Sequence, residues 1–205
     1  MAYKDFTLEQ VTTQFGLTQE FLPLFRGIKT FEPSPWLQET LSLSLRLALP
    51  SGNEKARSEF IIAPILLELE RSYPNDIFIF SGKNLDVERN QGLVGECDFI
   101  ISQGNIPLFM QLPILGIVEA KKDDIDGGLG QCVAQMYGAQ LFNKNHKSSL
   151  TIIYGCVTSG EIWQFLKLEE NILTIDLDRY YINRVADIIS CLRTVVEQAI
   201  FLKKE

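Results

Sequence analysis

The amino-acid sequence predicts an α/β protein built on a mixed β-sheet with helices packed on its faces. The first observation is a set of short apolar stretches bounded by turn residues, which is typical of β-strands. The second is their order along the chain, in which a helix, three strands, a helix and a further strand follow one another. The stretches that predict these strands are residues 76–82, 95–102, 114–122 and 150–160.

Residues 1–50 predict a helical extension ahead of the sheet. Residues 7–16 carry a capping box, Thr7 with Gln10, and a stop at Gly16. Residues 31–50 are ambiguous, because Ser34-Pro35 is a good helix start whereas five leucines from Leu41 to Leu49 alternate with a period of two. We expect a helix in the first half of this stretch.

Residues 51–205 predict the main domain. It begins with a long helix over 53–74, which Pro64 should kink or divide. Residues 84–92 either continue the first strand or form a hairpin arm. Further along, the pattern predicts a loop over 123–128, a helix over 129–143, a hairpin over 161–177 turning at Glu170-Asn171, and an amphipathic helix over 182–204.

Composition limits the functional classes. The formal net charge of −7 and pI of about 4.9 are unlike a typical nucleic-acid binder, so DNA would have to be held by a local cluster of cations. The four cysteines lack a CxxC spacing and predict reduced residues of a cytoplasmic protein, not a zinc site or a disulfide. The N-terminus has no apolar signal region, and the apolar runs are too short or interrupted to span a membrane.

Charged residues stand at the end of one predicted core strand, where burial is expensive. Glu119 and Lys121 share one face of that strand, because side chains alternate. Asp98 lies on the preceding strand and can lie beside Glu119 if the two strands pair. Two adjacent carboxylates repel unless a cation lies between them, and Mg²⁺ or Mn²⁺ suits such oxygen ligands. Taken singly, each residue also fits a plain ion pair or a strand-end aspartate.

Two helices supply further candidates. Glu54 and Glu59 flank Arg57 at the start of the 53–74 helix, and either glutamate could point toward the same place. Gln131 and Gln135 are four residues apart and so share one helix face. The alternative is that the glutamates are first-turn acids favoured by the helix dipole and that the glutamines form an exposed polar face.

The ordered set resembles the PD-(D/E)xK nuclease superfamily, whose fold is restriction-endonuclease-like. It is most similar to the nuclease domain at the N-terminus of type I restriction enzyme R subunits and to stand-alone relatives, cyanobacterial proteins among them. The stretches that carry the resemblance, within about 53–165, are "EKAR" with "YP", "DFII", "IVEAK", "GQCVAQMYGA" and "VTSGEIWQF".

The sequence also departs from the family pattern. Cys97 stands where the family name has proline, an apolar excursion, "IPLFMQLP", separates Asp98 from Glu119, and Gln135 stands where related recombination nucleases have tyrosine. Either Gln131 or Gln135 could therefore be the equivalent glutamine.

The resemblance implies a metal-dependent endonuclease that hydrolyses DNA, of restriction or repair type. In that mechanism Asp98, Glu119 and the Ala120 carbonyl bind Mg²⁺ or Mn²⁺, and Lys121 positions or polarises water. Glu54 or Glu59 would serve a second metal, and Gln131 or Gln135 would hold the phosphate or Lys121. DNA is the expected partner, and a homodimer or partner subunit would allow both strands to be cut. The alternatives are a non-catalytic nucleic-acid or protein-binding module of the same fold and a structural ion cluster.

Overall fold

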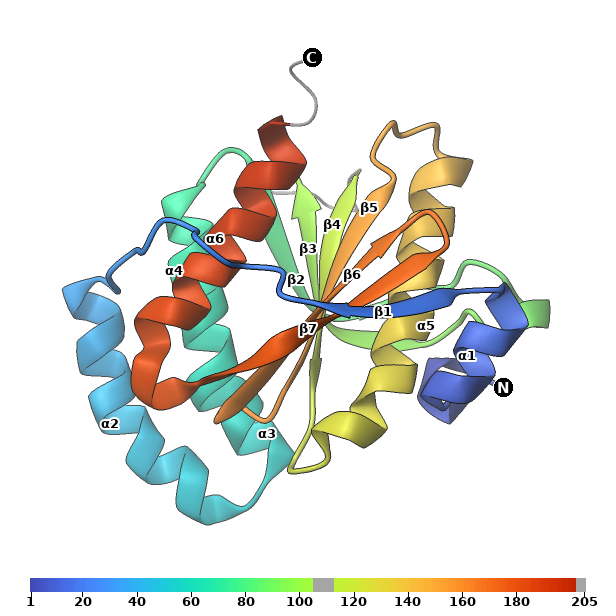
Figure 1. Ribbon diagram of the computed structural model, residues 1–205. Helices are drawn as coiled ribbons and strands as arrows, with labels where there is room; N and C mark the ends of the chain where they lie inside the picture. Colours follow the sequence, from blue (N-terminus) through green and yellow to red (C-terminus); the bar gives the residue numbers. More distant parts are fainter. Residues whose placement is uncertain (105–112, 202–205) are drawn as a thin grey trace.

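A computed structural model describes residues 1–104 and 113–201 and contains one seven-stranded sheet (Figure 1). The strand order is β1-β7-β6-β5-β4-β3-β2; β1 pairs with β7 and β4 with β5 in parallel, and the other four neighbouring pairs are antiparallel. The α/β class with helices on the sheet is therefore confirmed. The strands are β1 (Thr18–Leu22), β2 (Ile77–Asn84), β3 (Glu96–Gln103), β4 (Ile114–Ala120), β5 (Ile152–Thr158), β6 (Ile162–Glu169) and β7 (Ile172–Tyr181).

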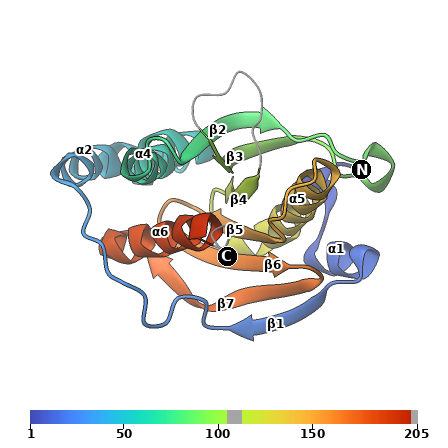
Figure 2. The same ribbon diagram turned by 90° about the horizontal axis from the view of Figure 1, so that it is seen from above.

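Helices cover both faces of this sheet (Figure 2). One face is packed by α1 (Leu8–Phe15) and α5 (Ile125–Asn145), and the other by α2 (Pro35–Ser51), α4 (Ala63–Ser72) and the long C-terminal α6 (Val185–Phe201). Short helical turns complete the chain: η1 (Tyr3–Asp5), α3 (Glu54–Arg57), η2 (Ser58–Ile62), η3 (Arg89–Gln91) and η4 (Ile182–Arg184). The predicted C-terminal helix is confirmed up to residue 201, and its last predicted residues lie outside the described part of the chain, as does most of "IPLFMQLP".

The helical segment from α3 to α4 is divided ahead of Pro64, as predicted. Its middle, η2, is a turn of π-helix in which the Ala63 amide donates to the Ser58 carbonyl. A proline inside a helix lacks an N–H and its ring clashes with the preceding turn, so a wider turn here lets the helix continue. Turns of this kind are frequent at functional sites, and η2 carries Ser58 and Glu59.

The structure corrects two expectations and decides a third. Residues 35–51 form one helix throughout, because the buried positions Leu37, Leu41, Ser44 and Ala48 recur at helical spacing and outweigh the alternating leucines. The loop expected over 123–128 ends early, since Asp124 caps α5 and the helix starts at Ile125. Of the two alternatives for residues 84–92, the structure shows the hairpin arm. Beyond Asn84, the Leu85 amide donates to the Gly95 carbonyl at 2.9 Å, and Glu88 forms an antiparallel bridge with Leu93.

A strand within the N-terminal region was not predicted. β1 pairs in parallel with β7, from Thr18 opposite Ile172 to Leu22 opposite Asp176. Both faces of β1 are largely exposed, so the alternating burial that identifies a strand in sequence is missing. The boundary at residue 50 between an extension and a main domain stays a prediction.

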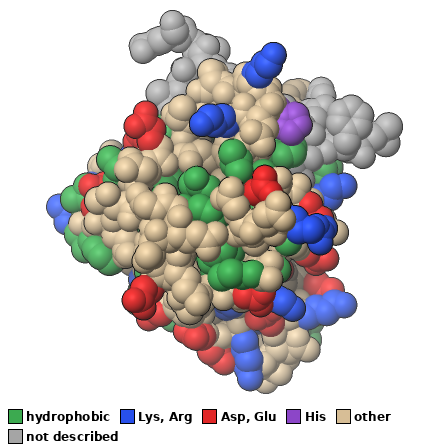
Figure 3. All heavy atoms as spheres, turned by 90° about the vertical axis from the view of Figure 1, so that its right-hand side faces the viewer, with side chains coloured by type: hydrophobic (Ala, Val, Ile, Leu, Met, Phe, Trp, Pro, Cys, Tyr) green, Lys and Arg blue, Asp and Glu red, His purple; other side chains and the backbone are tan. Residues whose placement is uncertain are grey.

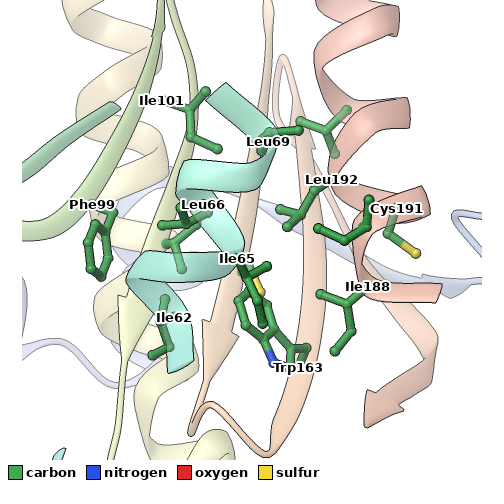
Figure 4. Packing of buried hydrophobic residues seen from close by; sticks show 14 of the residues in the cluster. Ile62, Ile65, Leu66, Leu69, Phe99, Ile101, Trp163, Ile188, Cys191 and Leu192 are labelled. Carbon is green, nitrogen blue, oxygen red and sulfur yellow. The ribbon is translucent and has the colours of Figure 1, made fainter. Parts of the chain in front are cut away.

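Two apolar cores sandwich the sheet. In the core shown in Figure 4, Ile62, Ile65, Leu66 and Leu69 face the sheet residues Phe99, Ile101 and Trp163 and the α6 residues Ile188 and Leu192. The second core lies between the opposite face and α5. The predicted 161–177 hairpin is β6–β7, with Glu170 in the left-handed region at its turn (φ 53°). All four cysteines are buried and free, and no described helix is long and apolar enough to cross a membrane.

Candidate active site

The predicted charges meet at the end of the sheet where β3 begins and β4 ends. The β3–β4 register ends with Phe99 opposite Val118, so Asp98 and Glu119 are the next residues of their strands. The Asp98 carboxylate accepts a hydrogen bond from the amide of Ala120, and Asp98 raises the pKa of Glu119. The pairing of the two strands therefore brings the two acids near each other.

Asp98 is fixed by the backbone of the neighbouring strand. Its Oδ2 accepts a 2.7 Å hydrogen bond from the Ala120 amide. Burial raises its pKa, the Ala120 hydrogen bond and Lys121 lower it, and Glu54 and Glu96 raise it again, with a net increase. Asp98 also lines a cleft of about 260 Å³, so its carboxylate is reachable from solvent.

Glu119 is only 2% exposed. Its Oε1 accepts from the Lys121 amine at 2.7 Å, and its Oε2 accepts from the Gln135 amide nitrogen at 2.8 Å. Burial and the nearby Asp98 carboxylate raise the pKa of Glu119 to about 7, although Lys121 and Gln135 oppose the increase. Two acids with raised pKa values side by side form a centre that favours a cation.

Lys121 is held by α5. Its amine donates to the Gln131 side-chain oxygen at 2.9 Å in addition to Glu119, and its stem lies against Gly128, where a Cβ would come within 2.9 Å of Lys121 Cγ. Burial lowers the pKa of Lys121, but Glu119, Glu54 and Asp98 outweigh it, so the pKa is raised and the amine stays charged.

Both glutamines therefore lie at the site, with different partners. Gln131 contacts Lys121, whereas Gln135 is fully buried, binds Glu119 and makes a longer contact of 3.5 Å to the Glu96 carbonyl. The Gln135 Oε1 atom is buried without a hydrogen-bond partner. One face of α5 thus brings both predicted glutamines into contact with the two charged groups.

Both N-terminal glutamates line the same cleft. Glu54 is close enough to raise the pKa values of Asp98 and Lys121. Glu59 pairs with Lys55 at 3.8 Å, in an exposed contact. One acid from α3 and one from η2 thus lie at the cleft with Asp98 and Ala120.

Glu96 was not singled out from the sequence, and Arg57 was given no role. Glu96 lines the cleft; its place two residues before Asp98, on the same side of an alternating strand, is the signal that could have identified it. Arg57 is 8% exposed and donates to the Ser159 carbonyl at 3.1 Å, with Asp123 at 3.7 Å and Glu161 at 3.6 Å. It ties α3 to the loops that follow β4 and β5.

The donor set suits magnesium in one specific way. Within residues 1–104 and 113–201, no three Asp, Glu, His or Cys side chains gather closely enough to form a complete metal cage. Mg²⁺ in phosphoryl-transfer sites, however, is commonly held by one or two carboxylates and keeps waters and substrate oxygens as its other ligands. Asp98 with Glu119, whose charges repel each other in a buried setting, fits that mode, and Ala120 lies at the same cleft.

Charge elsewhere offers little general attraction for nucleic acid. On the face that carries α1 and α5, the described Lys and Arg side chains stand among Asp and Glu and form no continuous basic patch (Figure 3). Nonspecific DNA affinity depends on cations that meet phosphates. On this face, any such binding therefore depends on individually placed cations.

Compared with protein-family models and with curated proteins, the sequence matches none.

Proposed function

We propose that this protein is a divalent-metal-dependent nuclease that hydrolyses DNA phosphodiester bonds, with a restriction-endonuclease-like arrangement of its sheet. The observation that carries the proposal is the cluster of Asp98, Glu119 and Lys121 where β3 begins and β4 ends, with Asp98 on a cleft. An ion pair with no further role would not need a second carboxylate beside it that raises the pKa of the first.

Asp98, Glu119 and the Ala120 carbonyl are the groups that would hold Mg²⁺ or Mn²⁺. When bound, the ion would stabilise negative charge on the phosphate and lower the pKa of water. The Ala120 amide holds the Asp98 carboxylate in one orientation, and Gln135 does the same for Glu119. Lys121, oriented by Gln131, places a positive charge where the pentavalent phosphate develops negative charge.

A non-catalytic binding module of the same fold is the second candidate. Its support is the acidic balance of the molecule, with a net charge of −7 and four glutamates or aspartates lining the cleft. Such a module would bind a partner without turnover, and the acids would serve only to fix the strand ends.

Cleavage of DNA in Mg²⁺ or Mn²⁺, compared among three proteins, tests the proposal. We expect Lys121→Ala to lower the cleavage rate at least about 100-fold, because it removes a charge aimed at the transition state. Lys122→Ala, which removes the adjacent exposed lysine, is the matched control and should retain wild-type activity. Melting temperatures of all three distinguish lost chemistry from lost folding.

Metal binding is tested separately by thermal shift. At a Mn²⁺ concentration 100 times Kd, the wild type should gain roughly 2.7 kcal/mol, a Tm rise of about 5–10 °C, and Asp98→Ala should lose most of it. If the wild type gains no stability from any divalent ion and cuts no duplex, single-stranded or nicked DNA, the binding-module candidate replaces the nuclease.

A further inference from the structure

A continuous row of paired residues crosses the sheet from the candidate site. Glu119 on β4 pairs with Val157 on β5, Val157 pairs with Gln164 on β6, and Gln164 pairs with Arg179 on β7. Paired residues share a face, so Arg179 emerges on the same side of the sheet as Glu119. Three strand spacings separate them, roughly 14 Å, or about four base-pair steps along a DNA duplex.

Arg179 is held in place by buried polar groups. Its Nε donates at 2.9 Å to the side-chain oxygen of Gln164, which is 4% exposed, and Gln164 in turn donates at 2.8 Å to the Asp176 carbonyl. The pairing of β6 with β7 shifts register between Gln164 and Leu166, and the Asp176 carboxylate supports this irregularity by accepting from the amides of Asp178 and Leu24. Bulges of this kind re-aim side chains beside active sites.

Among the described residues, the far end of the guanidinium is paired with one exposed acid. Arg179 Nη2 contacts Asp126 in the first turn of α5, and the Asp126 side chain is 72% exposed. Exposed ion pairs contribute little stability, whereas buried polar groups are costly unless they are hydrogen-bonded. The hydrogen bond to the buried Gln164 therefore fixes Arg179, and another anion can replace the exposed Asp126.

The first turns of α5 connect this arginine to the candidate site. Asp126 contacts Arg179, and Gly128, two residues later, packs against the stem of Lys121 and against Val157. Arg179 and Lys121 thus lie on either side of the start of one helix. The molecule as a whole has a net charge of −7 and does not attract a polyanion. A cation fixed at this distance from the acidic cleft supplies that attraction locally.

We propose that Arg179 is a second phosphate-binding residue, which holds the DNA backbone a few nucleotides from the scissile bond and which Asp126 occupies in the free protein. The inference rests on the proposed function for the identity of the polyanion. Guanidinium groups bind phosphate through paired N–H donors, and the two terminal nitrogens of Arg179 remain for that role because Nε is committed to Gln164.

Equilibrium binding of a fluorescein-labelled 30-base-pair DNA duplex, measured by anisotropy in Ca²⁺ over a salt series, tests the inference without cleavage. Arg179→Gln should weaken binding roughly tenfold and make the slope of log K against log salt less negative by about 0.9. Asp126→Asn should strengthen binding, because it frees the guanidinium while leaving the arginine in place. The opposite signs of these two changes are the signature of a competing carboxylate.

The matched controls come from another exposed arginine–aspartate pair, Arg89 with Asp86, which lies off the row. Arg89→Gln and Asp86→Asn repeat the same chemical changes and should alter affinity less than twofold. Asp126→Asn changes an exposed residue, so it reports on the inference even if Arg179→Gln lowers the melting temperature. Arg179→Lys provides a further check, since it keeps the charge without the hydrogen bond to Gln164 and should recover only part of the affinity.

The outcomes separate this inference from the nuclease proposal. If the wild type binds and cuts DNA while Arg179→Gln and Asp126→Asn behave like the control pair, the role of Arg179 is overturned and the nuclease stands. If the two variants shift affinity in opposite directions but no divalent ion supports cleavage, the phosphate contact stands and the catalytic proposal falls. A wild type that binds no duplex overturns the role of Arg179.

Discussion

At the scale of a single residue, burial changes how readily the Glu119 carboxylate ionises. At 2% exposure, a carboxylate is costly to ionise, and Asp98 beside it increases that cost. Lys121 and Gln135 occupy both of its oxygens and offset part of the cost. The sequence places Glu119, Lys121 and Asp98 correctly at the ends of two strands, because period-two alternation assigns the faces. Glu96 could have been found by the same alternation, since it stands two residues before Asp98.

The pH dependence of stability follows from this residue. Because burial and then Asp98 raise the pKa of Glu119 from 4.5 to about 7, the folded protein keeps a proton between these pH values that the unfolded chain has released. Without metal, this residue therefore makes the free energy of unfolding fall as pH rises from about 4.5 to 7, by on the order of 1 kcal/mol per pH unit. Its contribution is constant above that range.

We expect Glu119→Gln to remove this decline. The measurement is urea unfolding at several pH values in the presence of a chelator, for the wild type, Glu119→Gln and the exposed control Glu39→Gln. The stability of Glu119→Gln relative to the wild type should rise between pH 4.5 and 7, whereas that of Glu39→Gln should follow the wild type. Parallel profiles for all three proteins would mean that Glu119 titrates normally.

At the scale of elements, α5 organises the site because several of its residues are glycines at points of close approach. Gly128 leaves room for the side chains of Lys121 and Val157 to pack against the helix. A Cβ at Gly130 would lie 2.4 Å from the Phe6 carbonyl oxygen. The sequence places the centre of this helix well, but the run "DDIDGG" suggested a loop. Only packing against the N-terminal segment explains why glycines are retained inside a helix that they weaken.

Gly130→Ala tests this close approach. In an exposed helix, replacing glycine by alanine gains up to about 1 kcal/mol; here the added methyl meets backbone atoms of residues 6–8, which cannot move aside as a side chain would. We expect the free energy of unfolding to fall by about 1–3 kcal/mol, measured by chemical denaturation. Lys144→Ala, at an exposed position of the same helix, should stay within about 0.5 kcal/mol of the wild type. An increase in stability for Gly130→Ala would show that α1 is not docked on α5 in this way.

At the scale of the whole molecule, the first fifty residues belong to the same packed body as the rest. β1 closes one end of the sheet on β7, and Leu37, Leu41 and Ala48 of α2 are buried in the core beneath α4. A helical pattern describes this region only in part, because a short strand exposed on both faces leaves no periodic trace in the sequence.

A chain that starts at residue 51 should therefore fail to fold cooperatively. Without residues 1–50, the core would lack the buried side chains Leu37, Leu41 and Ala48, and the outer edge of β7 would be unpaired. Circular dichroism melts and dye binding, compared with the full chain, measure this directly. A cooperative transition with a melting temperature close to that of the full chain would establish residues 51–205 as an independent domain.

By itself, the sequence determined the α/β class, the placing of Asp98, Glu119 and Lys121 at strand ends, and the β6–β7 hairpin. These follow from alternation, helical spacing and turn residues, which act within a few neighbouring positions. The tertiary structure alone decided that both glutamines contact the charged groups, that β1 completes the sheet, and that Arg179 shares a row with Glu119. Those relations depend on which strands lie side by side and in what register, and register is set by the packing of residues far apart in the chain.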